Sequence, residues 1–275
     1  MVAPVPWTSF FALGDSFTEG MSDELRPDGR YRGWADRVAE TMAASNPSMR
    51  YANLAVRGKL IDQVVVEQLI PALDMLDEPK ATLVSFHGGP NDALRPRVDL
   101  SDLANRYERA VRLLTNSGVT VMLFTVIERA GGTGRTADRL ARRFATFNDS
   151  IRATARHHEA RLVDQAALPA LNDRRMWNDD RLHLAPEGHR RVAALAWHVL
   201  SGAESPDAGS DEAWWTQPLP PRTQLSRRQA VAEDSRWVRS HLAPWVGRRL
   251  RGVSSGDGVE AKDTAPHPVA TAPQP

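Results

Sequence analysis

Short apolar runs alternate with longer segments of helical periodicity over residues 8–199, and this alternation restricts the possible folds more than any other feature. Five runs have the length and composition of buried strands: residues 8–13, 51–56, 81–86, 119–127 and 161–164. The remaining segments repeat apolar side chains every three or four positions: residues 33–44, 60–76, 103–114, 140–151 and 192–199. Strands that alternate with helices form a parallel sheet covered on both faces. We therefore predict an α/β fold with a five-stranded parallel sheet.

Composition and charge exclude several classes of function. The chain has no cysteine, which excludes disulfide scaffolds, cysteine-based zinc sites and thiol nucleophiles. Its net charge of +1 is not that of a polycation built to bind nucleic acid. No apolar run approaches the roughly 18 residues that a membrane span needs, and residues 1–11 lack the basic residues of a secretory signal peptide. We therefore expect a cytoplasmic protein with no nucleic-acid partner.

The composition changes after residue 201, and we predict four regions on that basis. They are a catalytic or binding domain (1–201), an acidic, Pro-rich linker (202–221), a basic amphipathic helical appendage (222–252) and a disordered tail (253–275).

The appendage combines basic charge with tryptophan. Residues 222–251 hold eight arginines against Glu233 and Asp234, so their net charge is +6 and that of the remaining chain is +1 minus 6, or −5. A basic helix with tryptophan can lie on an anionic membrane surface, which would give a peripheral membrane contact through residues 222–252. Alternatively, Trp237 and Trp245 pack on the body of the protein, and we favour this packing.

A serine directly after the first predicted strand suits a nucleophile. Ser16 lies in the glycine-flanked segment 14–20, at a strand end, where α/β sheets bind ligands. A strand-to-helix turn exposes the hydroxyl and directs a backbone N–H into the site. Taken alone, this segment could equally be a polar turn in which Asp15 or Ser16 caps a helix.

Two further clusters contain the partners that such a serine needs. Asn91, in a Gly/Pro turn over residues 89–92, can donate a hydrogen bond to a developing oxyanion. His183 can act as a base, with Asp180 three residues earlier to orient it. Taken singly, Asn91 is more often an ordinary turn residue, and Asp180 and His183 are more often a helix cap and a surface histidine.

The clusters occur in the order serine, asparagine and Asp/His, and with this order the sequence resembles the SGNH hydrolases, also called the GDSL esterase/lipase family. Four blocks carry the resemblance: Gly14-Asp15-Ser16 with Thr18 and Gly20, Asn53 with Gly58, Gly89 to Asp92, and Asp180 to His183 with Pro186 and Gly188. The resemblance spans residue 8 to about residue 200. It implies a flavodoxin-like three-layer α/β/α sandwich.

The resemblance also implies a role for each matching residue. Ser16 would be the nucleophile, His183 the general base and then the general acid, and Asp180 the residue that orients His183. The N–H groups of Ser16 and Gly58 and the side-chain amide of Asn91 would form the oxyanion hole. The implied activity is hydrolysis of a small-molecule carboxylic ester or thioester through an acyl-serine, with no cofactor and no metal.

Two other functions stay open at this point. The same fold can bind a nucleotide or phosphate, although the chain has neither a GxGxxG nor a Walker A sequence. The chain could also be a hydrolase-like interaction module whose C-terminal helix is the functional part. His87 is expected to be structural, and the pair His157 and His158 to interact with a helix dipole rather than with a metal.

Overall fold

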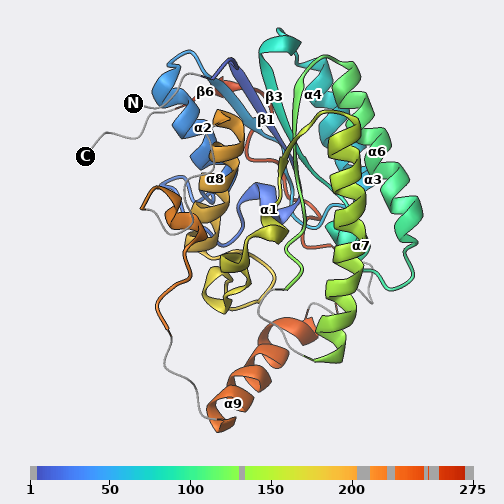
Figure 1. Ribbon diagram of the computed structural model, residues 1–275, viewed down its shortest axis with the longest axis vertical. Helices are drawn as coiled ribbons and strands as arrows, with labels where there is room; N and C mark the ends of the chain where they lie inside the picture. Colours follow the sequence, from blue (N-terminus) through green and yellow to red (C-terminus); the bar gives the residue numbers. More distant parts are fainter. Residues whose placement is uncertain are drawn as a thin grey trace.

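The computed structural model describes residues 5–129, 134–202, 211–221, 227–244, 247 and 254–269. Its centre is a six-stranded sheet with the order β5-β4-β3-β1-β2-β6 (Figure 1). The strands are β1 (Ser9–Gly14), β2 (Arg50–Asn53), β3 (Thr82–His87), β4 (Thr120–Phe124), β5 (Arg161–Val163) and β6 (His267–Pro268). The first five are parallel, and their order 2-1-3-4-5 is that of flavodoxin-like folds. The predicted three-layer fold is confirmed.

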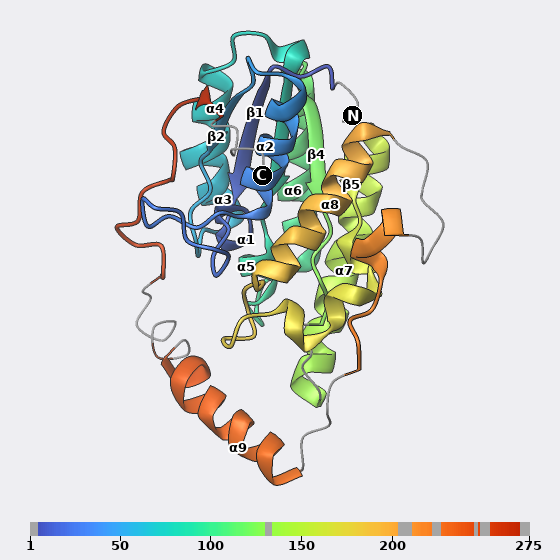
Figure 2. The same ribbon diagram turned by 90° about the vertical axis from the view of Figure 1, so that its left-hand side faces the viewer.

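Helices cover both faces of this sheet (Figures 1 and 2). The longer ones are α2 (Trp34–Ser45), α6 (Leu100–Asn116), α7 (Arg135–His157), α8 (Pro186–Ser201) and α9 (Arg227–Trp237). The shorter ones are α1 (Ser16–Glu19), α3 (Ile61–Val64), α4 (Ile70–Asp74) and α5 (Pro90–Ala93). Single 3₁₀ turns are η2 (Pro79–Ala81), η3 (Gln165–Ala167), η4 (Pro169–Asn172), η5 (Arg174–Met176) and η6 (Asp211–Thr216), and π-helical turns are η1 (Val65–Leu69) and η7 (Val238–Leu242). None of the helices within the described ranges is long and apolar enough to cross a membrane.

The central strand β1 explains why the sequence reads as continuous apolar runs. Phe10 and Ala12 are buried against α2 and α8 on one face, whereas Phe11 and Leu13 are buried against α3, α6 and α7 on the other. A strand covered on both faces buries every side chain, so its sequence does not alternate with polar residues. The apolar pattern therefore places β1 in the middle of the sheet, with its carboxyl end available for a site.

The predicted helix over residues 60–76 changes its geometry just before Pro71. It consists of α3, the π-helical turn η1 and α4, with Pro71 in the first turn of α4. Proline has no N–H and collides with the preceding turn, so a regular helix cannot continue through it. The wider turn η1 comes directly before that position.

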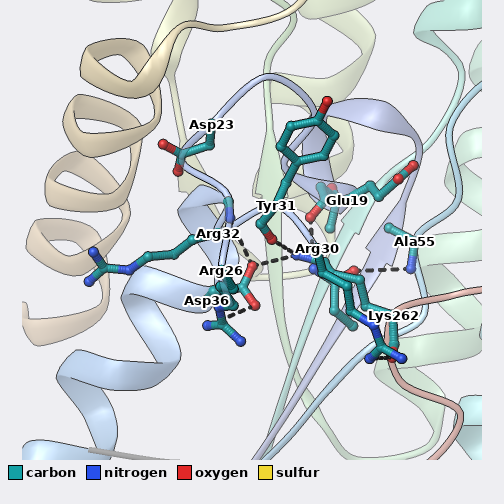
Figure 3. A network of polar contacts seen from close by, with 12 residues as sticks. Glu19, Asp23, Arg26, Arg30, Tyr31, Arg32, Asp36, Ala55 and Lys262 are labelled. Atoms are coloured by element: carbon teal, nitrogen blue, oxygen red, sulfur yellow. Dashed lines mark hydrogen bonds and ion pairs between the residues drawn. The ribbon is translucent and has the colours of Figure 1, made fainter. Parts of the chain in front are cut away.

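The end of the chain differs from the prediction of a disordered tail over residues 253–275. Residues 254–269 lie along the sheet, where β6 pairs antiparallel with β2 and adds a sixth strand to the five predicted. The Lys262 ammonium lies 2.6 Å from the buried carboxylate of Asp36 (Figure 3). The composition pointed to disorder because this segment can bury little apolar surface, but edge pairing and polar contacts hold it instead. Residues 270–275 lie outside the described ranges.

The predicted helical appendage contains α9 and η7, which lie beyond the carboxyl ends of the strands (Figure 2). Upstream of it, η6 packs on α8, with the Trp214 ring 4.9 Å from the Arg190 guanidinium. Trp237 is half-buried, and its indole Nε1 donates a hydrogen bond to the backbone carbonyl of Asp180 at 2.8 Å. Trp245, the second tryptophan of the packing prediction, lies outside the described residues.

Candidate active site

The predicted site residues surround one cavity of about 400 Å³ at the carboxyl edge of the sheet. Ser16, Gly58, Asn91, Asp180 and His183 all line it. They follow β1, β2 and β3 or precede α8, so four separate parts of the chain contribute. Parallel strands end at the same edge of a sheet, which is why residues so distant in sequence meet there.

Ser16 is the first residue of the one-turn helix α1. Asp15 caps this helix, because its Oδ1 accepts a hydrogen bond from the N–H of Phe17 at 3.1 Å. Gly14 has to be glycine, since a Cβ there would lie 2.6 Å from the Thr18 hydroxyl. Both sequence interpretations of this turn therefore apply together: Asp15 caps the helix and Ser16 lines the cavity. Among the described residues, the Ser16 hydroxyl has no hydrogen-bond partner.

The buried carboxylate of Asp15 also holds Asn91. Asn91 Nδ2 donates to Asp15 Oδ2 at 3.1 Å and to the Lys59 carbonyl at 3.0 Å, so both amide hydrogens are in use. Nδ1 of His87 lies 3.5 Å from Asp15 Oδ1, and the His87 ring packs against Phe17 in a tilted arrangement with centroids 4.4 Å apart. Sequence reasoning missed this role of Asp15 and treated it only as a helix cap, because nothing local links residue 15 to residue 91.

A half-buried ion pair supports the loop that carries Gly58. The Glu19 carboxylate accepts hydrogen bonds from the backbone N–H of Arg57 at 2.7 Å and from its guanidinium Nε at 2.9 Å. Asn53 fixes the other end of the loop, because Nδ2 donates to the Thr18 carbonyl at 2.8 Å. Gly58 has φ of +75°, a conformation that favours glycine. The loop is thus anchored to α1, and Gly58 lines the same cavity as Ser16.

Asp180 and His183 form a close pair within one turn. His183 Nδ1 lies 2.6 Å from Asp180 Oδ2, and Asp180 Oδ1 accepts the backbone N–H groups of Leu182 at 2.9 Å and His183 at 3.0 Å. Burial alone would raise the pKa of Asp180, but the hydrogen bond and charge of His183, together with the two backbone donors, lower it to about 2. Asp180 is therefore ionised at any ordinary pH and can orient the imidazole.

The cavity has an apolar side and a second wall that the sequence did not indicate. The apolar lining includes Pro90, Leu94, Val126, Ile127, Leu140 and Phe144. The other wall comes from the C-terminal part of the chain: Ser240, His241, Pro244 and Ser255. A binding site with an apolar lining and a few polar groups at one end suits a small organic ligand.

The remaining histidines lie in different surroundings. His189 also lines the cavity, but burial lowers its pKa to about 3, and its Nε2 donates to the Met21 carbonyl at 3.1 Å. It is therefore a neutral structural group. Among the described residues, Glu108, His157 and His158 could together ligate a metal ion, since their ligand atoms lie within 4.8 Å of one another. This group does not line the cavity, and Arg112 already pairs with Glu108 at 3.5 Å.

Comparison with known proteins supports the fold and the family. Residues 12–191 match the GDSL-like Lipase/Acylhydrolase family, which covers more than half of the chain. A comparison with curated proteins finds no match.

Three solved structures illustrate the likeness in fold. TesA is 18% identical with a TM-score of 0.56, and the match covers 70% of this chain and 97% of TesA. The lipase/acylhydrolase from Enterococcus faecalis is 20% identical with a TM-score of 0.53, covering 70% of this chain and 95% of its own. Axe2, an acetylxylan esterase from Geobacillus stearothermophilus, is 19% identical with a TM-score of 0.54, covering 74% and 98%.

The fold and the family match define a hydrolase that acts on esters. The chain belongs to the GDSL-like lipase/acylhydrolase family.

Proposed function

We propose that the protein is a serine esterase that cleaves a carboxylic ester or thioester through an acyl-Ser16 intermediate. The observation that carries the proposal is the close pair of Asp180 and His183 in the same cavity as Ser16. A histidine whose Nδ1–H is held by an ionised carboxylate presents its Nε2 as a base. Family membership favours this reaction over nucleotide binding or a purely structural role.

The reaction runs in two steps. The Ser16 oxygen attacks the carbonyl carbon of the ester while His183 Nε2 takes the hydroxyl proton. The tetrahedral intermediate then collapses, the bond to the leaving group breaks, and His183 returns the proton to the departing oxygen or sulfur. In the second step water attacks the acyl-serine, His183 takes a proton from the water, and Ser16 regains that proton as the carboxylic acid leaves. The Ser16 hydroxyl has no hydrogen-bond partner within the described part of the chain, and contacts between nucleophile and base often tighten only when substrate binds.

The proposed oxyanion hole consists of the N–H groups of Ser16 and Gly58 and the amide of Asn91. The anchoring of the Gly58 loop by Glu19 and Arg57 supports this role, because preformed donors stabilise developing charge most effectively. Asn91 uses both amide hydrogens without substrate, so the oxyanion has to take over the one that now reaches the Lys59 carbonyl. The hydrogen bond to Asp15 would then keep the amide oriented during the reaction.

The test is a panel of p-nitrophenyl esters, from acetate to palmitate, with wild type, Ser16→Ala and the surface control Ser101→Ala. Loss of the nucleophile of a triad lowers kcat by about a million-fold. We expect Ser16→Ala to lose turnover of every ester and Ser101→Ala to match wild type. A fluorophosphonate probe should label wild type at Ser16. Turnover in Ser16→Ala at the wild-type rate, or labelling at another serine, would overturn the assignment.

A further inference from the structure

The C-terminal extension, described over residues 211–221, 227–244 and 254–269, lies beyond the segment that matches the family, residues 12–191. The three solved structures above are matched over 95–98% of their own length but over only 70–74% of this chain. The extension is therefore additional to the common fold, and its contacts show what it contributes.

Both ends of the extension are attached to the body of the protein. At the upstream end, the Arg191 guanidinium donates to the Trp215 carbonyl at 3.0 Å. At the downstream end, Lys262 pairs with Asp36 and donates to the Tyr31 carbonyl at 2.9 Å (Figure 3). The upstream attachment is on α8, whereas the downstream attachment is on α2 and the loop before it, next to β2. Helix α9, which comes between them in the sequence, lies beyond the carboxyl ends of the strands (Figure 2).

Helix α9 contacts the turn that carries Asp180 and His183. The Trp237 indole donates to the Asp180 carbonyl at 2.8 Å, so this bond ends on the backbone of the residue that orients the histidine. The Arg181 guanidinium lies over the Trp237 ring at 4.9 Å and 2.8 Å from the Asp234 carboxylate. Arg181 has φ of +59°, a strained conformation for a residue with a side chain, and such conformations persist only where the surroundings hold them.

The extension also touches the opposite side of the site. The Ser254 hydroxyl donates to the Gly58 carbonyl at 3.4 Å, and a Cβ at residue 58 would lie 2.3 Å from that hydroxyl. Between these two contacts, Ser240, His241 and Pro244 line the cavity. The same extension thus contacts the turn of the proposed base and the loop of the proposed oxyanion hole.

We propose that the extension is a strap that completes the active site, and that Trp237 is a positioning residue for Asp180 and His183. This inference rests on the proposed function of that pair. Without the indole donor, the strained turn at Arg181 loses its support and the carboxylate moves away from the imidazole. A displacement of about 1 Å in a catalytic constellation can cost about 100-fold in rate.

The variants that test the proposal are Trp237→Ala, Trp237→Phe and the matched control Trp214→Ala. Trp214 belongs to the same extension and lies over Arg190 at the same 4.9 Å, but it contacts no predicted site residue. We expect Trp237→Ala to lower kcat by about 10- to 100-fold. The acid limb of its kcat/KM–pH profile should also move to lower pH, because an imidazolium without its carboxylate is less stable. Trp214→Ala should keep the wild-type kcat and pH profile. Trp237→Phe keeps an aromatic ring but loses the N–H, so its kcat should lie between those of wild type and Trp237→Ala.

A second readout does not depend on turnover. In wild type, the hydrogen bond between His183 Nδ1 and Asp180 should give a strongly downfield proton resonance. We expect that resonance to be lost or shifted in Trp237→Ala and Trp237→Phe but kept in Trp214→Ala. If wild type hydrolysed no ester, the proposed function would fail while this measurement still tested the strap. An unchanged kcat, pH profile and resonance in folded Trp237 variants would overturn the proposal.

Discussion

At the scale of single residues, the site depends on the different hydrogen bonds that the two carboxylate oxygens of Asp180 make. One oxygen holds the backbone of its own turn and the other faces His183 Nδ1. The pKa of Asp180 is lowered to about 2, so this carboxylate stays ionised well below neutral pH. The loss of activity on the acid side should therefore come from protonation of His183 and not from Asp180.

The first prediction concerns pH and the variant Asp180→Asn. Because a protonated His183 cannot accept the Ser16 proton, kcat/KM should fall as pH drops below neutral. An asparagine that keeps its oxygen on the backbone would turn its NH₂ toward His183 and impose the wrong tautomer, which costs about 10⁴-fold in kcat. Asp179→Asn is the control, since its side chain is 98% exposed. Wild-type activity in Asp180→Asn, or activity that is flat down to pH 4.5, would move the orienting role elsewhere.

The second prediction concerns Asn91. In Asn91→Ala the oxyanion loses one donor, so kcat should fall by about 10² to 10³ with a smaller effect on KM. Removing the amide also leaves the buried Asp15 carboxylate without that hydrogen bond. Steady-state kinetics on one p-nitrophenyl ester would measure the effects on kcat and on KM separately. A rise in KM alone would instead place Asn91 in substrate binding.

At the scale of elements, β6 and the segment before it act as an anchor. Lys262 is 8% exposed and Asp36 only 2%, and Asp36 also lies 3.2 Å from Arg26. Val269 packs against the core, but most of the segment is held by this buried pair, by other polar contacts and by edge pairing with β2.

The third prediction follows from that anchor. Lys262→Ala removes one of two cations from a buried carboxylate, so the free energy of unfolding should fall by about 1–3 kcal/mol, less than the full cost of breaking an isolated buried pair. Urea unfolding measures this change. The exposed Lys80→Ala should stay within about 0.5 kcal/mol of wild type. Equal stabilities for the two variants would show that the anchor contributes little.

At the scale of the whole molecule, opposite charges favour contact between the appendage and the body. The appendage carries +6 over residues 222–251 and the rest of the chain −5. Trp237 is engaged with Asp180, and Arg181 pairs with Asp234, so part of the helix face that a membrane would need is used internally.

The fourth prediction is that the wild-type protein does not sediment with vesicles of anionic lipid at physiological salt. Contacts of surface charges weaken beyond about 8 Å at that ionic strength, and the half-buried Trp237 would have to leave Asp180 before it entered the lipid. Co-sedimentation that decreases as salt rises would favour the membrane alternative. Vesicles of neutral lipid are the control.

Local patterns in the sequence were sufficient for the core fold and for the expectation that the candidate site residues meet at one edge of the sheet. The continuous apolar run identifies β1 as a strand buried on both faces, and Pro71 marks the break within the predicted helix over residues 60–76. Both effects act over a few neighbouring residues. Ser16, Asn91 and His183 each stand at a strand end or in the last loop, and parallel strands bring those ends together.

Tertiary structure alone decided how the rest of the chain surrounds the site. Asp15 meets Asn91 across 76 residues, Trp237 meets Asp180 across 57, and Lys262 meets Asp36 across 226. Each contact joins a polar side chain to one partner, and no repeating pattern in the sequence reports such a pairing. The two members of each pair come together only when the chain has folded. This is why a tail whose composition predicts disorder can form a sixth strand.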